Sequence, residues 1–241
     1  MPDTTPPPHQ TLSHWARIAL GALVLYLLVA YVILPRWDKR KARLDDDLRD
    51  GPHLTHTGTG LPGDPLNIAL VGSEEDLVRS MTAAGWYPAD PLTFRSSVRI
   101  AADTVFERPD DSAPVSNLYL FGRKEDFAFE KPVGDSPRER HHVRYWRTAK
   151  ADDGRPVWIG SAAFDIGVEL SRTTGQVTHH ISPDVDAERS LILADLTKAN
   201  RVVGTRWVTG FHKELQGRNG GGDPWHTDGR LAIVTLPPTR P

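Results

Sequence analysis

The stretch VWIGSAAFDIGVEL, residues 157–170, decides the fold of the main part of this chain. It is apolar on both sides of Asp165, which lies between Ala163 and Gly167, and it contains no proline. Such a run predicts a β-strand with both faces covered. A carboxylate in that position is expected to be buried, and a buried carboxylate needs an ionic or hydrogen-bonding partner.

Other segments with strand character lie on both sides of this one. They are separated by Gly, Asp or Pro, which favours tight connections. The segments are NIALV (67–71), SNLYLFG (116–122), FAFEKPV (127–133), HHVRYWRT (141–148), VTHHI (177–181), VVGTRWVTGF (202–211) and RLAIVTL (230–236).

Helical patterns are fewer and are set apart from the strands. A capping box that starts at Ser73 predicts a helix over residues 74–84, and apolar spacing predicts two more, over 93–106 and from Pro183 to about Ala199. Neighbouring strands with segregated helices indicate an α+β domain on a mainly antiparallel mixed sheet.

The N-terminal part has a different character. Residues 18–34 carry no charge and are flanked by Trp15 and Trp37, which predicts one transmembrane helix over residues 15–36, in contact with the lipid bilayer. The remaining boundaries that we expect are a disordered N-terminus (1–14), a charged juxtamembrane spacer (37–52), a folded domain (53–236) and a tail (237–241).

Charge around this helix predicts its orientation. Arg17 stands alone before it, whereas the basic residues after it are Arg36, Lys39, Arg40, Lys41 and Arg43. Positive charge stays on the cytoplasmic side, so we expect the soluble domain in the cytoplasm at the inner membrane.

Composition excludes several classes of function. The formal net charge of −2 gives no basic field for nucleic acid. The chain has no cysteine, which excludes disulfides, thiolate metal sites and thiol catalysis. Gly58, Gly60 and Gly63 have dinucleotide-fingerprint spacing, but they precede a strand instead of following one and are interpreted as turns. Residues 217–224, GRNGGGDP, are expected to form a flexible loop.

Two histidine pairs are the candidate chemical groups. Adjacent side chains of a strand point to opposite faces, so His141 and His179 are expected to face inward and His142 and His180 outward. His141, His179 and Asp165 could form a metal or catalytic site, because imidazole and carboxylate bind divalent metals. Their spacing matches no metal signature, and we favour a hydrogen-bonded structural network with no cofactor.

The segment THHISPDVDAER, residues 178–189, leads from a strand into a helix. Ser182 fits the helix N-cap and Pro183 its first residue, with the following carboxylates near the positive end of the helix dipole. As an alternative, His180, Asp184 and Glu188 could converge on a metal. Anion-binding candidates lie on the preceding histidine strand and are Arg138, Arg140, His142 and Arg144.

Five strings in order resemble one family. They are TGTGLPGDPLN (57–67), FGRKEDFAFEKP (121–132), RERHHVRYW (138–146), GSAAFDIGVEL (160–170) and HHISPDVDAER (179–189). Together they resemble the LssY-like C-terminal domain over about residues 53–236. The resemblance implies a bacterial cell-envelope or export context, with other membrane or envelope proteins as partners, and it implies no particular reaction.

Two hypotheses of function follow. The first is a membrane-anchored binding or assembly module. The second is a metal-dependent hydrolase of a phosphorylated or lipid substrate, centred on His141, His179 and Asp165. Whether the chain is an enzyme stays open from sequence.

Overall fold

The structure is a computed structural model that describes residues 14–89, 117–134, 136–152, 154–170 and 177–239. Of residues 136–138, 168–170 and 177–179 it describes the backbone alone. The chain divides into two compact units, Met1–Arg43 and Leu44–Pro241. The helix expected over residues 93–106 lies outside the described residues.

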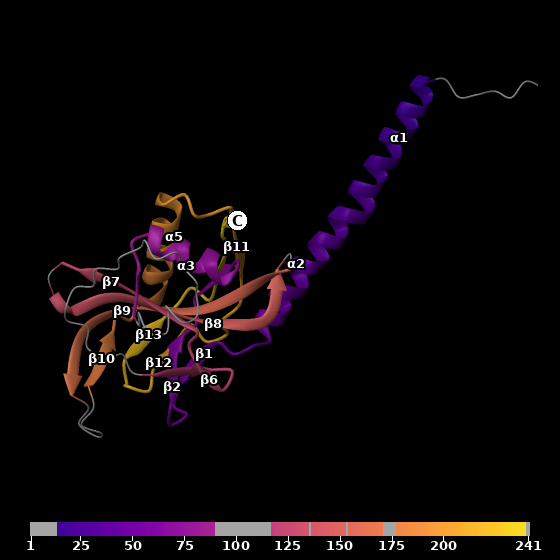
Figure 1. The fold of residues 1–241 in the computed structure, drawn as a ribbon. Helices are drawn as coiled ribbons and strands as arrows, with labels where there is room; N and C mark the ends of the chain where they lie inside the picture. The colour runs from indigo at the N-terminus through magenta and orange to yellow at the C-terminus, as the bar shows by residue number, and fades with distance from the viewer. Residues whose placement is uncertain (1–13, 90–116, 135, 153, 171–176, 240–241) are drawn as a thin grey trace, which may run out of the picture. The chain divides into compact units, whose positions relative to one another are not determined.

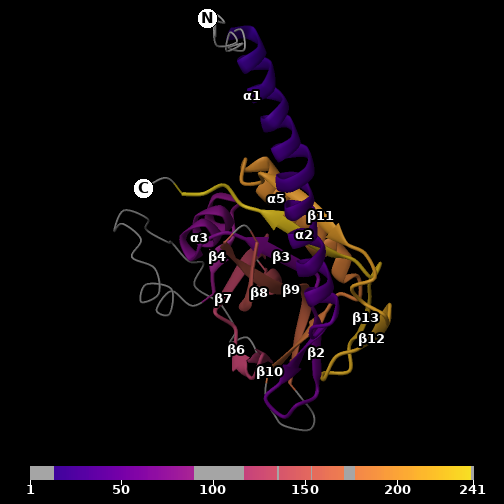
Figure 2. The same cartoon turned by 90° about the vertical axis from the view of Figure 1, so that its right-hand side faces the viewer.

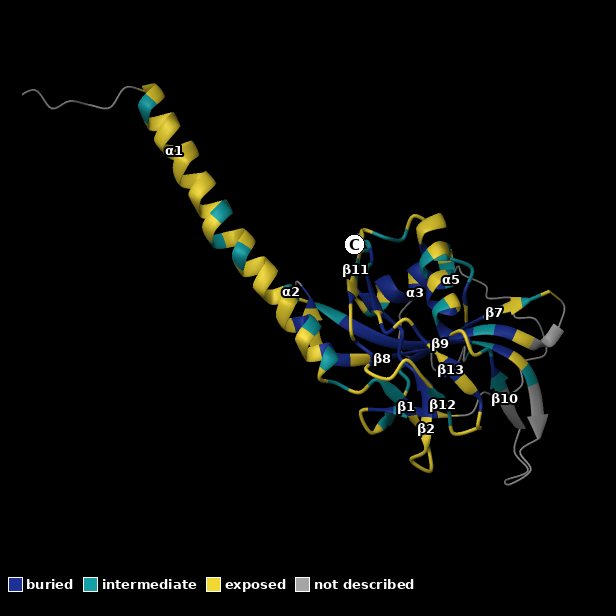
Figure 3. Cartoon of the chain, turned by 180° about the vertical axis from the view of Figure 1, so that it is seen from behind, coloured by how far each residue is buried: buried dark blue, intermediate teal, exposed yellow. Residues whose placement is uncertain are grey.

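The first unit confirms the predicted apolar helix. Helix α1 (His14–Leu28) continues through η1 (Val29–Ile33) into α2 (Leu34–Arg49), as Figure 1 shows. Together they form a helix of 36 residues that is long and apolar enough to cross a membrane, and its apolar stretch is exposed (Figure 3). The widened turn of η1, with the Leu34 N–H bonded to the Val29 carbonyl, directly precedes Pro35. A proline cannot complete the normal helical ladder, so a local widening relieves the clash that its ring would cause.

The end of α2 belongs to the second unit. Leu44 and Leu48 are buried in its core at 5% exposure each. Asp45 pairs with Arg206, and the Lys150 ammonium lies 2.9 Å from Asp47. The segment that the sequence assigns to a spacer is therefore helical as far as Arg49, and its last residues are part of the folded domain.

The main sheet is built around two long strands, β8 (Ser136–Asp152) and β9 (Arg155–Leu170). Among the described residues its order is β11-β14-β3-β9-β8-β7-β4, with β10 also paired to β9. Of the described pairs in this sheet, β14 with β3 is parallel and the others are antiparallel. The other strands are β3 (Ile68–Val71), β4 (Tyr87–Pro88), β7 (Phe127–Val133), β10 (Val177–Ile181), β11 (Gly204–Val208) and β14 (Leu231–Thr235).

Different layers cover the two faces of this sheet. Figures 1 and 2 show helices α3 (Glu74–Ala83) and α5 (Val185–Lys198) on one side. On the other side lie a smaller sheet of order β2-β1-β5-β6 and a hairpin of two short strands. The strands of this second layer are β1 (Leu54–Thr57), β2 (Pro62–Pro65), β5 (Leu118–Leu120), β6 (Arg123–Lys124), β12 (Gln216–Arg218) and β13 (Pro224–His226).

This arrangement confirms the predicted α+β class, with a mainly antiparallel mixed sheet and segregated helices. The helix-side core contains Leu77 and Val78 of α3, Ile192 of α5 and Tyr145 of β8. The core on the other side contains Leu44, Trp146 and Leu118. Side chains alternate along a strand, so the long central strands contribute to both cores at once.

The start of helix α3 is predicted correctly by the capping signal in the sequence. Ser73 accepts a hydrogen bond from the Asp76 N–H, and the Asp76 carboxylate accepts one from the Ser73 N–H at 2.8 Å. This is the capping box that the sequence predicts. Gly58 and Gly60 lie in the turn between β1 and β2 as expected, where Gly60 has a φ of 82°, whereas Gly63 is part of strand β2.

The start of α5 differs from the prediction. Asp184, not Ser182, is the N-cap, and its carboxylate accepts hydrogen bonds from the N–H groups of Asp186 and Ala187. Ser182 is still tied to the sheet, because its N–H donates to the Phe164 carbonyl at 2.8 Å. Pairing with β9 therefore continues to Ser182, and the helix begins two residues later than local helix signals suggest.

The glycine-rich segment at 217–224 is more ordered than the sequence suggests. Its ends belong to β12 and β13, and Asn219 organises the turn between them by accepting hydrogen bonds from the N–H groups of Gly221 and Asp223. The Asn219 amide donates to Asp64 at 3.1 Å, which ties the turn to β2. The expectation of a flexible loop is wrong, because the segment is a hairpin turn in which two backbone N–H groups donate hydrogen bonds to the Asn219 side chain.

Candidate functional site

Strand β8 separates the two candidate histidines. Val143 and Tyr145 lie in the helix-side core, whereas Trp146 lies in the core on the opposite side. His141 therefore faces the helices, and His142 faces the second layer together with Arg140 and Arg144. The predicted alternation of this strand is confirmed, but the expectation that His142 faces outward is wrong, because the second layer covers this face and leaves His142 only 5% exposed.

Asp165 belongs to the face of His142. It lies opposite Arg140 in the ladder between β8 and β9 and is fully buried. The Arg140 Nε donates to Asp165 Oδ2 at 3.0 Å, and the His142 Nδ1 lies 3.1 Å from Asp165 Oδ1. The second contact has an ion-pair distance without hydrogen-bond alignment. Asp165 thus has the buried cationic partner that its position in the sequence requires.

The same face carries further buried charges. The Arg140 guanidinium also donates to Glu130 at 3.2 Å, and Arg144 lies 4.0 Å from Asp64. We call this set the polar layer: Asp64, Glu130, Arg140, His142, Arg144 and Asp165, each less than 9% exposed. A charge is costly to bury unless it is paired, and here guanidinium and carboxylate groups alternate.

His180 also meets a carboxylate. Its Nδ1 lies 2.5 Å from Asp223 Oδ1, and the other oxygen of Asp223 accepts a hydrogen bond from the Ile181 N–H. The His180 side chain is 35% exposed and that of Asp223 only 10%. This pair fastens the β12–β13 hairpin to strand β10.

His141 makes its contacts on the helix side. Its Nδ1 lies 2.8 Å from Glu188 Oε2 of α5, and its ring stacks on Phe164 with a centroid distance of 4.7 Å. The side chain of Glu188 is 6% exposed. The pair therefore joins β8 to α5 inside the protein.

The two predicted metal sets do not assemble. His141 and Asp165 lie on opposite faces of the sheet, and the side chain of His179 lies outside the described residues, as does that of the anion-binding candidate Arg138. In the second set, His180 pairs with Asp223, Asp184 caps α5 and Glu188 pairs with His141. Within the described residues no three His, Asp or Glu side chains are placed to hold a metal.

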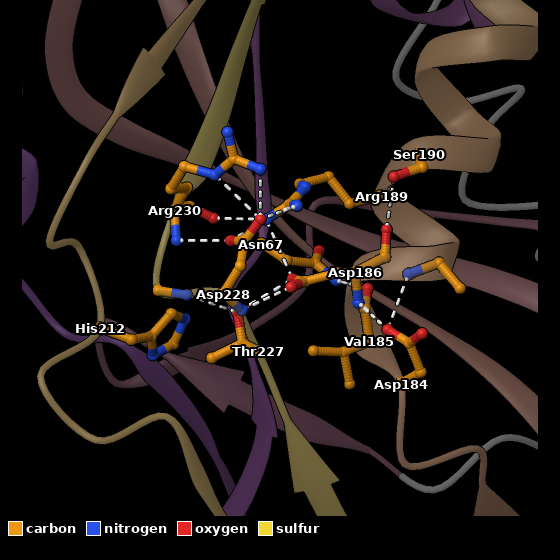
Figure 4. A network of polar contacts seen from close by, with 12 residues as sticks. Asn67, Asp184, Val185, Asp186, Arg189, Ser190, His212, Thr227, Asp228 and Arg230 are labelled. Atoms are coloured by element: carbon orange, nitrogen blue, oxygen red, sulfur yellow. Dashed lines mark hydrogen bonds and ion pairs between the residues drawn. The ribbon is translucent and has the colours of Figure 1, made fainter.

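The network around Arg189, which Figure 4 shows, was not predicted from the sequence. This side chain is 2% exposed and donates to both oxygens of Asp228, at 3.0 and 2.8 Å. Its guanidinium lies 2.9 Å from Asp186, and it stacks with Arg230 on the ring of Trp207. Sequence alone suggests an exposed arginine, because Asp228 is far along the chain and gives no local signal.

Asn67 is a second residue that the sequence did not single out. It is fully buried directly before β3, where its amide donates to the carbonyls of Ala162 and Val185 and accepts from the Ala162 N–H. One side chain thus joins β3, β9 and the first residue of α5. Together with His141 and Glu188, it fixes α5 on the sheet.

Burial shifts the pKa of His212. Desolvation is the largest effect and lowers the pKa, and the nearby positive charge of His53 lowers it further. The hydrogen bond that its Nε2 donates to the Leu66 carbonyl at 2.7 Å raises the pKa, but the net direction is downward. For Asp228, burial alone would raise the pKa, but hydrogen bonds from Arg189 and Arg230 outweigh it and hold the pKa well below its usual range.

Fold and site together define a class: an α+β domain with a buried polar layer, continuous with an apolar N-terminal helix. The model of the family LssY C-terminus matches residues 48–231, most of the chain. The chain belongs to this family. The comparisons with curated proteins and with solved structures each gave no match.

Proposed function

We propose that this chain is a single-pass membrane protein whose LssY-like domain is a binding or assembly module of the bacterial cell envelope or export apparatus. The domain faces the cytoplasm from the inner membrane. The family and the apolar helix support the anchored architecture. The orientation rests on the basic residues between Arg36 and Arg43, against Arg17 alone on the other side.

Fusion reporters test the orientation. A fluorescent protein that matures only in the cytoplasm is expected to be active after Pro241, and an alkaline phosphatase that needs the periplasm is expected to be inactive there. A matched control replaces the five basic residues after the helix with Gln and adds basic residues before it. The control should raise the phosphatase signal. A phosphatase that is active in the wild-type fusion would contradict a cytoplasmic domain.

One observation carries the binding-module proposal. Two candidate histidines, one from each of the two predicted sets, engage different carboxylates in different places: His141 with Glu188, and His180 with Asp223. These pairs link secondary-structure elements to one another, which is a structural use of the side chains. The alternative, a metal-dependent hydrolase built on His141, His179 and Asp165, loses geometric support because His141 and Asp165 lie on opposite faces of the main sheet.

Photo-crosslinking in native membranes tests for a partner. Val203 and Leu215 are apolar and 65% and 52% exposed on the domain, so each is suited to carry a photoreactive residue. We expect an adduct of one defined size at one of these positions. The same group at Lys213, an exposed polar position two residues from Leu215, serves as the matched control. Absence of any adduct at both apolar positions would argue against an assembly module.

An activity assay tests the alternative. The full chain in detergent is mixed with a chromogenic phosphate ester, with and without divalent metal. We expect no turnover above that of the His141→Gln variant. Metal-dependent turnover that this substitution abolishes would overturn the binding-module proposal in favour of the hydrolase.

A further inference from the structure

The imidazole of His142 has an unusual environment. It is 5% exposed, and neither of its ring nitrogens makes a hydrogen bond among the described residues. Buried polar atoms in folded proteins almost always have a partner, so such an atom points to a bound molecule or to a chemical role. His142 is therefore the position in the polar layer where a ligand is expected.

The other side of the ring indicates what Nε2 accepts. The Nδ1 lies 3.1 Å from the carboxylate of Asp165, close enough for charge attraction but without hydrogen-bond alignment, and Arg140 donates a hydrogen bond to that carboxylate. A carboxylate next to Nδ1 favours the hydrogen on that nitrogen and leaves the lone pair on Nε2. The missing partner of Nε2 is then a hydrogen-bond donor.

Two guanidinium groups flank this acceptor, and each also faces a carboxylate of the polar layer. Arg140 and Arg144 precede and follow His142 by two residues on the same strand, so all three side chains share one face. The two arginines are 6% and 3% exposed. Guanidinium groups in a buried setting suit the oxygens of an oxyanion. The ligand that fits both features carries negative oxygens and an acidic hydroxyl on the same group.

We propose that His142, Arg140 and Arg144 bind a monoprotonated phosphate group, either free phosphate or the phosphate of a lipid headgroup. The P–OH donates to His142 Nε2, and the charged oxygens face the arginines. This inference rests on the proposed function, because it names the ligand of a binding module. Its test does not involve the protein partner, so the two proposals fail separately.

Calorimetry on the full chain in nanodiscs of neutral lipid provides the first test. Inorganic phosphate is the probe, and sulfate is the matched anion, since sulfate has no hydrogen to donate near neutral pH. We expect saturable phosphate binding and sulfate binding about 10- to 100-fold weaker, the difference made by one hydrogen bond to a charged group. Equal binding of both anions, or binding of neither, would overturn the proposal.

A pair of variants localises the site. His142→Phe keeps a flat ring without nitrogens and is expected to weaken phosphate binding by about 10-fold or more. His141→Gln changes the adjacent histidine on the opposite face and should leave binding unchanged. Equal weakening in both would overturn the assignment to His142.

Nitrogen NMR of the wild-type chain covers the case in which His142→Phe does not fold. With labelled histidine, phosphate should move the Nε2 resonance of His142 and leave that of His141 in place. An unmoved His142 resonance at saturating phosphate would contradict the proposal.

Two further probes separate the sources of the phosphate group. Nanodiscs that contain phosphatidic acid should block binding of added phosphate if the ligand is a headgroup, and soluble glycerol 3-phosphate should then bind at the same site. If the ligand is free phosphate, phosphatidic acid should have no effect. Either result is consistent with a phosphate site at His142, whereas failure of both phosphate and glycerol 3-phosphate to bind would exclude it.

Discussion

His141 Nδ1 lies 2.8 Å from Glu188 Oε2, across the interface between strand β8 and helix α5. The glutamate side chain is 6% exposed and the histidine side chain 21%. Its sequence neighbour, His142, faces Asp165 on the opposite side of the sheet at 3.1 Å. Two adjacent histidines therefore face two separate layers of the domain.

Loss of the His141–Glu188 pair is expected to destabilise the domain. His141→Ala leaves Glu188 buried without this partner and should lower the free energy of unfolding by about 1–3 kcal/mol. Chemical denaturation of the full chain in detergent measures the change. A double-mutant cycle with Glu188→Gln should give a coupling energy of about 0.5–3 kcal/mol. Additive effects of the two substitutions would mean that they do not interact.

The end of α2 is expected to matter to the stability of the domain. Leu48→Ala should lower the free energy of unfolding by about 2–5 kcal/mol, because it opens a cavity in the core. Leu215→Ala, at a side chain that is 52% exposed, is the matched control and should change it by less than about 0.5 kcal/mol. A fragment that begins at His53 should melt lower than one that begins at Leu44. Equal melting temperatures would show that α2 is dispensable.

His212 should make the domain less stable in mild acid. Its pKa is lowered in the folded state, so the unfolded chain binds a proton more readily than the folded one. The stabilisation is complete above the unfolded pKa of about 6.5 and is lost as the pH falls through the folded value. His212→Gln retains a donor for the Leu66 carbonyl and should flatten this part of the profile. Melting temperatures between about pH 5 and 7.5 compare the two proteins, and parallel profiles would contradict the assignment.

Replacing Arg189 with lysine is expected to destabilise the domain. Arg189→Lys keeps the charge but loses the paired hydrogen bonds to Asp228 and the stacking on Trp207, and should cost about 1–3 kcal/mol. Arg230→Lys is the matched control, because Arg230 contacts the same two residues from an exposed position. It should cost clearly less. Thermal unfolding of both variants measures the difference, and equal costs would mean that burial of Arg189 adds nothing.

Local signals were sufficient for several elements. Ser73 and Asp76 lie three residues apart, so their capping box could be predicted from sequence and is confirmed. The alternation of β8 likewise places His141 and His142 on opposite faces. Hydrogen bonds within one turn, and the geometry of a single strand, depend on residues that are close in the chain.

Long-range partners could not be predicted in this way. The sequence does not show that Asp165 joins Arg140 and His142 and not His141, because strand register decides which side chains meet across a ladder. The same holds for Arg189, whose carboxylate partner Asp228 lies 39 residues further along the chain.

By itself the sequence determined the α+β class, the apolar helix that could anchor the chain, and the facing of side chains along β8. These follow from composition and from periodicities of two and 3.6 residues, which are local properties. The tertiary structure alone decided that α5 begins at Val185, that Leu44 and Leu48 belong to the core, and that the buried charges form one polar layer. Each of these depends on the free energy of burying groups from distant segments against one another, and no local pattern encodes that free energy.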